Sequence, residues 1–316
     1  MPTAPDKPRI LITGGDGQLG WELARAFATM GKVFAFDHAG LDLSDPDAIR
    51  ARCREVRPSL LLNAGAYTAV DKAESEAELA MRINGEAPGI LAEEANRLGA
   101  PLIHYSTDYV FDGNAKQPYR EDDAAEPKSV YGCTKLAGEQ AVTATANEYL
   151  VLRTSWLYSN RRHNFLLTML RLAKEREELR VVADQIGSPT WVRSVSEATA
   201  CFVNASTSRL KISIPSGIYH LAAAGQTSWH GFATAILDGT AKETRRATRV
   251  VAIATADYPT PAKRPAYSVL SLTKLKEASG MVPVDWREQL AGCLAERNSQ
   301  TSNVSPNMEN DSGKPE

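Results

Sequence analysis

The first regular part of this sequence reads ILITGGDGQLGWELARAF, residues 10–27. Its aliphatic start predicts a buried strand, and Gly14, Gly17 and Gly20 follow that strand directly. Apolar residues then recur every three or four positions, which predicts a helix over 18–30. A strand, a glycine turn and a helix in this order predict the first unit of a parallel α/β sheet.

The glycine turn has the residues needed to bind a pyrophosphate. Backbone without side chains can approach an anion closely, and a helix N-terminus points free N–H groups and the positive end of its dipole at it. Glycines also serve tight turns for purely conformational reasons, so the pattern alone leaves both interpretations open. We expect a dinucleotide contact from Gly14, Gly17, Gln18, Leu19 and Gly20.

Further strands and helices alternate up to about Trp156. This rhythm predicts a Rossmann domain over 1–156, with a doubly wound parallel sheet whose strands cover 10–13, 32–37, 60–65, 101–107 and 148–155. The pattern then loosens, and we expect a smaller α+β substrate lobe over 157–297, with crossings of the chain between the two domains allowed. Residues 298–316 are rich in Ser, Asn, Pro and Gly, which predicts a disordered tail.

Acidic and small residues at later strand ends extend the predicted cofactor site. Asp37 ends the second strand, where a carboxylate accepts hydrogen bonds from an adenosine ribose and repels a 2′-phosphate. A carboxylate at this position favours NADH as the cofactor. Nearby basic residues leave NADPH open as the other cofactor. The alternative role of Asp37 is that of a solvated residue at the end of a strand. Asp42 and Leu43 are spaced to reach the adenine. Ala64 and its small neighbours leave room for the cofactor at the third strand end.

A tyrosine and a lysine begin the helix predicted over 130–146. Tyr131 and Lys135 lie four residues apart, hence on one face, and a nearby ammonium favours the ionised phenol and lowers its pKa. Thr107 and Ser106 end a strand at the carboxyl edge of the sheet, where a hydroxyl can donate to a carbonyl oxygen. Such pairs also occur as surface contacts, and strand-end hydroxyls also form turns. Only together with the glycine turn do they point to reduction of a keto group.

Composition excludes several other classes of protein. The 316 residues are 43% hydrophobic and 23% charged, and the formal net charge of -2 supplies no basic field for a nucleic-acid partner. Four separated cysteines without a C-x-x-C pair, no signal peptide and no apolar span of ~20 residues predict a cytoplasmic protein without a membrane partner. Five histidines without metal-ligand spacing predict no metal catalysis.

Longer strings carry a resemblance to a known family. They are GQLGWELARAF (17–27), AYTAVDKAESE (66–76), HYSTDYVFDGN (104–114), VYGCTKLAGE (130–139), RTSWLY (153–158), NFLLTMLRLAKEREEL (164–179), DQIGSPT (184–190) and YPTPAKRP (258–265). With the glycine turn, they resemble the extended short-chain dehydrogenase/reductases that act on nucleotide sugars, and within these the dTDP-4-dehydrorhamnose reductase family. The resemblance runs from Arg9 to about Leu294.

That resemblance implies an activity and a set of roles. Hydride from NADPH or NADH reduces C4 of dTDP-4-dehydro-β-L-rhamnose, a small nucleotide-sugar substrate, in the last step of dTDP-L-rhamnose synthesis. Tyr131 is implied as the proton donor and Lys135 as its electrostatic partner. The implied cofactor contacts are Gly17, Gln18, Leu19, Asp37, Asp42, Leu43, Ala66, Tyr67, Thr68, Tyr131 and Lys135. The implied substrate contacts are Ser106, Thr107, Asp108, Trp156, Lys263 and Arg264.

The resemblance also bears on whether this chain binds a metal ion and forms a dimer. Some members bind Mg²⁺ at a dimer interface through glutamates, and Glu22 fits one such position. Arg193 stands where a second carboxylate would be expected, and its charge repels a cation. We therefore expect neither this metal nor this mode of dimerisation, and the sequence leaves a monomer and a homodimer open.

Three rival functions share the superfamily. A dehydratase needs a further acid/base pair after the threonine, but Asp108 is followed by Tyr109 here. An epimerase would retain its NAD tightly through a cycle of oxidation and reduction. A non-catalytic subunit would bind the dinucleotide without turnover, although Thr107, Tyr131 and Lys135 argue for chemistry.

Overall fold

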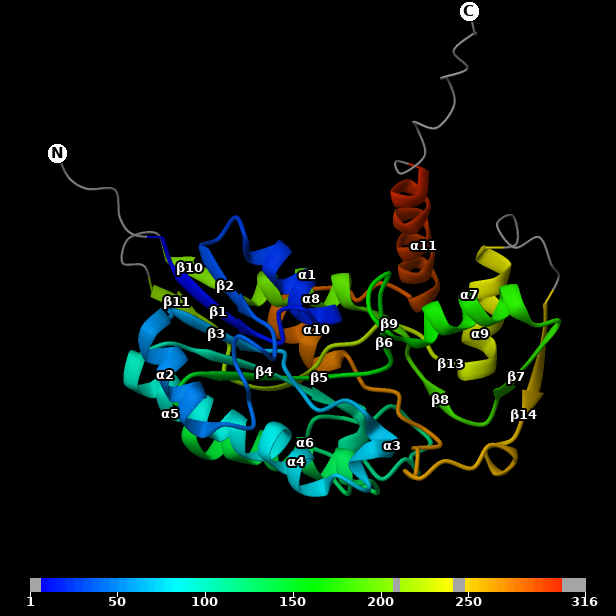
Figure 1. Cartoon of the computed structure of the whole chain (residues 1–316), viewed down its shortest axis with the longest axis horizontal. Helices are drawn as coiled ribbons and strands as arrows, with labels where there is room; N and C mark the ends of the chain where they lie inside the picture. Colours follow the sequence, from blue (N-terminus) through cyan, green and yellow to red (C-terminus); the bar gives the residue numbers. More distant parts are fainter. Residues whose placement is uncertain (1–6, 207–210, 241–247, 303–316) are drawn as a thin grey trace, which may run out of the picture.

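The computed structural model describes residues 7–206, 211–240 and 248–302. A six-stranded sheet forms its centre, in the order β12-β5-β4-β3-β1-β2, and every pairing in it is parallel (Figure 1). The strands are β1 (Arg9–Thr13), β2 (Lys32–Phe36), β3 (Leu60–Asn63), β4 (Leu102–Thr107), β5 (Tyr149–Thr154) and β12 (Gly217–His220). The five predicted strands and the Rossmann fold class are confirmed.

Helices cover both faces of this sheet because alternate strand residues point to opposite sides. Ile10 and Ile12 pack with α1 (Gln18–Phe27) and α8 (Val192–Phe202), whereas Leu11 packs in a separate cluster. That second cluster draws on α2 (Pro46–Val56), α5 (Ala87–Leu98) and α6 (Val130–Thr145). Figure 1 shows the two helical layers above and below the sheet.

The helix that we expected over about 76–98 is interrupted. The chain forms α3 (Val70–Ala73), α4 (Ala77–Met81), a π-helical turn at Arg82–Glu86 and only then α5. In the π-helical turn, the Asn84 amide accepts from the Tyr67 N–H at 2.8 Å and donates to the Tyr67 carbonyl at 3.0 Å. The interruption therefore fixes the loop that follows β3, as π-helical turns often do at functional sites.

A smaller lobe lies beside the carboxyl ends of the strands. Its own core joins Tyr158, Phe232 and Trp286. Its main elements are α7 (Phe165–Glu175), β7 (Glu178–Val182), α9 (Trp229–Gly239), β14 (Arg249–Ile253) and α11 (Trp286–Ser302). The remaining elements are β6 (Leu157–Tyr158), β8 (Ile186–Gly187), β9 (Thr190–Trp191), β10 (Asn204–Ser206), β11 (Lys211–Ser213), β13 (Thr227–Ser228), α10 (Thr273–Ser279) and the 3₁₀ turns Asp108–Val110 and Thr255–Asp257.

The chain crosses between the two parts, as we allowed. Both α8 and β12 follow residue 157 in sequence, yet α8 packs on α1 and β12 extends the main sheet. The boundary at 156/157 stays a prediction. Helix α11 continues to Ser302, into the predicted tail, and residues 303–316 of that tail lie outside the described residues. None of the described helices has the length and apolar character to cross a membrane.

Candidate active site

The carboxyl ends of the central strands open into a cavity of about 1440 Å³. Its lining includes the glycine turn and the loop after β3 from the main sheet, and α7, β7 and Trp229 from the smaller lobe. Pockets for one drug-sized ligand usually enclose ~300–1,000 Å³. The cavity therefore has room for a dinucleotide and a second ligand together.

The glycine turn has the geometry that an anion site requires. Gly14 has a φ of 66°, and a Cβ there would lie 2.7 Å from the Gly65 Cα. A Cβ on Gly20 would lie 2.1 Å from the Gly14 carbonyl oxygen, so only glycine allows α1 to start this close to the turn. No side chain caps α1 at Gly17, which leaves the first-turn N–H groups at Gln18 and Leu19 for a ligand. These features fit a dinucleotide pyrophosphate.

The segment that follows β6 holds this turn, which sequence reasoning missed. Ser159 and Asn164 both donate to the Gln18 side-chain oxygen, at 2.8 and 3.0 Å. Arg162 Nε donates to the Asp16 carbonyl at 2.9 Å and its guanidinium pairs with the Asp16 carboxylate. Because about 140 residues of chain separate the partners, no local pattern could have indicated these contacts.

Two of the three residues that we predicted to contact the adenosine line the cavity. Asp42 and Leu43 line the cavity, and hydrogen bonds from the Ser44 N–H and hydroxyl, both 2.8 Å, lower the Asp42 pKa. Asp37 does not line it. Its exposed carboxylate accepts from the Gly40 N–H at 2.8 Å and so closes a turn.

Residues of the segment that follows β3 line the cavity. Ala64, Ala66, Tyr67 and Thr68 all reach it. Beneath them, a chain of polar contacts fixes the backbone: the Gly65 N–H donates to Thr13 Oγ1 at 2.9 Å, Thr13 donates to Asn63 Oδ1 at 2.7 Å, and the Asn63 amide lies 3.0 Å from His104 Nδ1. Burial holds the His104 pKa well below its ordinary value, so this ring is neutral.

Tyr131 and Lys135 both reach the cavity from α6, but the predicted effect of one on the other is wrong. Burial raises the Tyr131 pKa above its ordinary value of 10, and a hydrogen bond with Thr107 opposes this rise. Lys135 instead donates to the Tyr105 carbonyl at 2.6 Å, and burial lowers the Lys135 pKa to about 8. The cost of placing charge in a dry site dominates here, and it favours the neutral phenol.

A buried carboxyl group stands next to these two residues. The Thr107 hydroxyl donates to Asp108 at 3.0 Å and the Ser155 hydroxyl donates to it at 3.1 Å. Burial, opposed by these hydrogen bonds, raises the Asp108 pKa to about 6. Ser106 also lines the cavity. Tyr109, the residue after Asp108, packs edge-on against Tyr131 with ring centroids 5.5 Å apart.

Trp156 begins the wall of the second lobe. Its φ of 48° is unusual for a bulky residue, and such strain clusters at functional sites. Its ring stacks on Trp229 with centroids 3.5 Å apart and an interplanar angle of 5°. A Cβ on Gly187 would lie 2.4 Å from the Trp156 ring, so glycine makes room for this pose. Sequence reasoning missed Trp229, because nothing local links it to Trp156.

Of the two residues that we predicted to contact the substrate diphosphate, only one lines the cavity. Arg264 lines the cavity, but its guanidinium already pairs with Asp71 at 2.8 Å and lies 3.5 Å from the Tyr109 hydroxyl. Lys263 is exposed and does not line the cavity. Other residues that we did not predict reach the cavity from the second lobe, among them Arg176, Arg180 and Tyr258.

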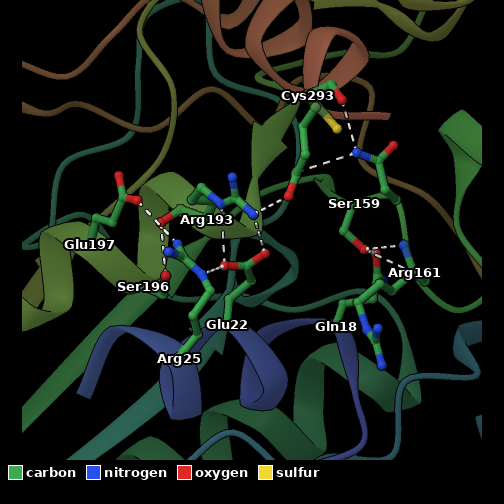
Figure 2. A network of polar contacts seen from close by, with 11 residues as sticks. Gln18, Glu22, Arg25, Ser159, Arg161, Arg193, Ser196, Glu197 and Cys293 are labelled. Carbon is green, nitrogen blue, oxygen red and sulfur yellow. Dashed lines mark hydrogen bonds and ion pairs between the residues drawn. The ribbon is translucent and has the colours of Figure 1, made fainter. Parts of the chain in front are cut away.

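The glutamate that fits the family's metal position lies between two guanidinium groups (Figure 2). Arg25 contacts one Glu22 oxygen at 2.8 Å and Arg193 the other at 3.2 Å, and Arg193 also pairs with Glu296. Within residues 7–206, 211–240 and 248–302, no group of three His, Cys, Asp or Glu side chains is arranged to hold a metal. Carboxylates that guanidinium groups already neutralise do not fit a divalent cation.

Comparisons with known proteins agree with this geometry. Residues 8–299 match the family described as RmlD substrate binding domain. A dTDP-4-dehydrorhamnose reductase from Burkholderia thailandensis is 47% identical over 297 residues, which cover 92% of this chain and 100% of that protein. The Bacillus anthracis dTDP-4-dehydrorhamnose reductase in complex with NADP has a TM-score of 0.83 at 35% identity, with coverage of 92% and 99%. The ortholog from Clostridium acetobutylicum has a TM-score of 0.84 at 36% identity, with the same coverage. The chain therefore belongs to the RmlD substrate binding domain family.

Proposed function

We propose that this chain is an NAD(P)H-dependent reductase that converts the C4 keto group of dTDP-4-dehydro-β-L-rhamnose into the hydroxyl of dTDP-β-L-rhamnose. This is the last step of dTDP-L-rhamnose biosynthesis. One observation carries the proposal: Thr107, Tyr131 and Lys135 meet in the cavity that the glycine turn also lines. Relatives over nearly the whole chain carry this activity in their names.

The cofactor would lie along one side of the cavity. The first-turn N–H groups at Gln18 and Leu19 would bind the pyrophosphate, with Asp42 and Leu43 at the adenosine end and the loop from Ala66 at the middle. When bound, NADPH or NADH supplies the hydride. Lys135 would donate hydrogen bonds to the nicotinamide ribose hydroxyls. Its side-chain nitrogen carries N–H donors in both the charged and the neutral form.

The residues beside this site would handle the proton. Tyr131 has a raised pKa, so its hydroxyl stays protonated at neutral pH and can donate to the carbonyl oxygen of the substrate. The Thr107 hydroxyl would donate to the same oxygen and stabilise negative charge there. Asp108 and Ser106 would contact the sugar hydroxyls, and Trp156 would pack against the sugar ring.

The rival functions predict different results in one assay. We expect the absorbance at 340 nm to fall when wild-type protein meets the 4-keto sugar and NADPH or NADH, and Tyr131→Phe to lose ~10²–10⁴-fold in kcat. Tyr109→Phe is the matched control, since it removes a neighbouring phenol. A protein that binds NADPH but gives no turnover would be the non-catalytic module. Cofactor that copurifies and is not consumed would indicate an epimerase.

We also propose that the protein works in the cytoplasm on a free nucleotide sugar, with no nucleic-acid partner. All four cysteines are free thiols in the structure. Free thiols persist in reducing compartments. Fractionation with a thiol-alkylation assay tests the location.

A further inference from the structure

Asp108 is a buried carboxyl group that lines the cavity directly after β4, with 2% of its surface exposed. Among the described residues it forms no ion pair, and its side-chain hydrogen-bond partners are the hydroxyls of Thr107, Ser155 and Ser268. A buried carboxylate without a cation costs folding free energy, and hydroxyl partners offset only part of that cost. A neutral amide could make the same contacts, so the acidic group points to a role in proton transfer.

The Thr107 hydroxyl connects this carboxyl group to Tyr131. It is hydrogen-bonded to Tyr131 and lies 3.0 Å from Asp108 Oδ1. The Ser155 hydroxyl holds the other carboxyl oxygen, Oδ2, at 3.1 Å. Because a hydroxyl can donate and accept at once and its hydrogen rotates, a proton can pass through Thr107 from the acid to the phenol.

The groups that face this chain of contacts leave the carboxyl group without a neighbouring charge. Tyr131 faces it from α6, and Tyr109 packs edge-on against Tyr131 from the turn that Asp108 begins. Arg264 lies 3.5 Å from the Tyr109 hydroxyl, but its charge is paired with Asp71. Burial, opposed by the hydroxyl hydrogen bonds, therefore sets the Asp108 pKa at about 6, so the acid form is accessible near neutral pH.

Tyr131 becomes a phenolate when it gives its proton to the keto oxygen. Burial raises the Tyr131 pKa, so this phenolate is a strong base that must regain a proton before the next turnover. Lys135 donates to the Tyr105 carbonyl at 2.6 Å, whereas the Thr107 hydroxyl contacts Tyr131 directly. The hydrogen bonds of the site therefore favour a supply of protons from the side of Asp108.

We infer that Asp108 is a proton-relay residue, which returns a proton to Tyr131 through the Thr107 hydroxyl after each reduction. The Tyr131 O–H bond breaks as the product O–H bond forms. Thr107 then gives its proton to the phenolate and takes the proton of the Asp108 carboxyl group. Solvent water protonates the Asp108 carboxylate once the product has left. The inference rests on the proposed function for the reaction that consumes the Tyr131 proton.

Rapid-mixing kinetics separate a relay from a structural role. Asp108→Asn keeps hydrogen bonds with Thr107 and Ser155 but holds no proton to transfer. The first turnover uses the proton that Tyr131 already holds, so we expect a burst of NADPH oxidation equal to the enzyme concentration, at a rate close to that of wild type. The steady-state rate should then be ~10²-fold below wild type, and an ultraviolet difference spectrum should show tyrosinate.

A matched control and a clear contrary result accompany this experiment. Asp112→Asn changes an aspartate of the same loop that lies outside the cavity, and it should match wild type in both phases. An Asp108→Asn protein that loses the burst and the steady-state rate by the same factor would show that Asp108 only shapes the site. A steady-state rate equal to that of wild type would show that another group supplies the proton. Either result overturns the inference.

The pH dependence of kcat identifies the group that supplies the proton. Only the protonated carboxyl group donates, so wild-type kcat at saturating substrates should fall as pH rises through about 6. Ser155→Ala removes a hydrogen bond to the carboxylate, which raises the Asp108 pKa and should move this fall to higher pH. A fall near pH 8 that persists in Asp108→Asn would assign the proton to Lys135 and overturn the inference.

Infrared spectroscopy tests the relay without turnover and so separates it from the proposed function. The carboxylic acid C=O band of Asp108, isolated by subtraction of Asp108→Asn, should appear below pH 6 and shift in Thr107→Val, which removes the bridging hydroxyl. Wild-type turnover without this band, or with a band that ignores Thr107→Val, would remove the relay and leave the reductase. Wild-type protein that shows the band but gives no turnover would overturn the proposed reaction and the relay with it.

Discussion

The ammonium group of Lys135 donates a 2.6 Å hydrogen bond to the backbone carbonyl of Tyr105. This contact ties helix α6 to strand β4 and holds the lysine in a buried position, with 3% of its surface exposed. Burial without a carboxylate partner lowers the pKa of Lys135 to about 8, although the more distant Glu139 opposes this shift. The same burial raises the Tyr131 pKa. The site thus holds an uncharged phenol beside an amine that titrates close to neutrality.

The Lys135 pKa predicts how cofactor binding depends on pH. As pH rises through about 8, Lys135 loses its charge and its strongest donor character. We expect the KM for NADPH to rise between pH 7 and 9 in wild type, and to be higher but independent of pH in Lys135→Met. Initial rates at saturating sugar measure this, and a wild-type KM that is flat across the range would contradict it.

The same group affects stability in a defined direction. The Lys135 pKa is depressed from 10.5 to about 8 in the folded state, so its stabilising contribution is present above 10.5 and is lost as pH falls through about 8. We expect the free energy of unfolding of wild type, relative to Lys135→Met, to increase from pH 7 to pH 10. Urea unfolding at each pH tests this, and a constant difference would show that Lys135 is not buried as described.

The raised pKa of Asp108 predicts the opposite dependence of stability on pH, since its contribution is lost as pH rises. Burial raises the Asp108 pKa from 3.8 to about 6, so its stabilising contribution is present below 3.8 and is lost as pH rises through 6. About two pKa units at ~1.36 kcal/mol each give ~3 kcal/mol. We expect Asp108→Asn, which keeps the contacts with Thr107 and Ser155, to be more stable than wild type at pH 7.5 by up to this amount. At pH 4 the gain should disappear, and a gain that persists there would refute the assignment.

The close packing at Gly20 predicts that only glycine is tolerated at this position of the turn after β1. An added Cβ would lie 2.1 Å from the Gly14 carbonyl oxygen, which is backbone and cannot swing away. We expect Gly20→Ala to lose ~1–3 kcal/mol of stability and most NADPH affinity. Gly89→Ala is the control, because its nearest neighbour would be the Ala141 Cβ at 3.2 Å. Unaltered NADPH binding in Gly20→Ala, measured by fluorescence titration, would disprove the close approach.

The ion pairs around Glu22 predict independence from divalent metals. Arg193 and Arg25 neutralise this carboxylate, so EDTA should change neither the activity nor the mass in solution, as measured by light scattering. We expect Arg193→Met to destabilise the fold by less than the ~3–5 kcal/mol of a broken buried pair, because Arg25 remains. The exposed pair removed by Arg171→Met should cost under ~0.5 kcal/mol. A loss of activity in EDTA that Mg²⁺ restores would contradict this interpretation.

Many residues that line the cavity could be predicted because their signals are local. The glycine spacing after β1 and the i, i+4 spacing of Tyr131 and Lys135 need only a few neighbouring residues to have meaning. Other features depended on partners elsewhere in the chain, and the ribose contact of Asp37 stays a prediction. Asp37 has the right position in sequence, but its carboxylate closes a turn with Gly40 and does not line the cavity. The π-helical turn at Asn84 was also missed, because its purpose is a contact with Tyr67 on another loop.

The sequence by itself determined the parallel sheet, the glycine turn after β1 and the helix face that carries Tyr131 and Lys135. Periodicity and glycine geometry act over one turn or one strand, and they survive any rearrangement of distant parts. Only the tertiary structure decided that Lys135 bonds to Tyr105, that Trp156 stacks on Trp229, and that Arg180 enters the cavity where Lys263 does not. These outcomes depend on which surfaces exclude water together, and burial of that kind arises when segments far apart in the chain pack against one another.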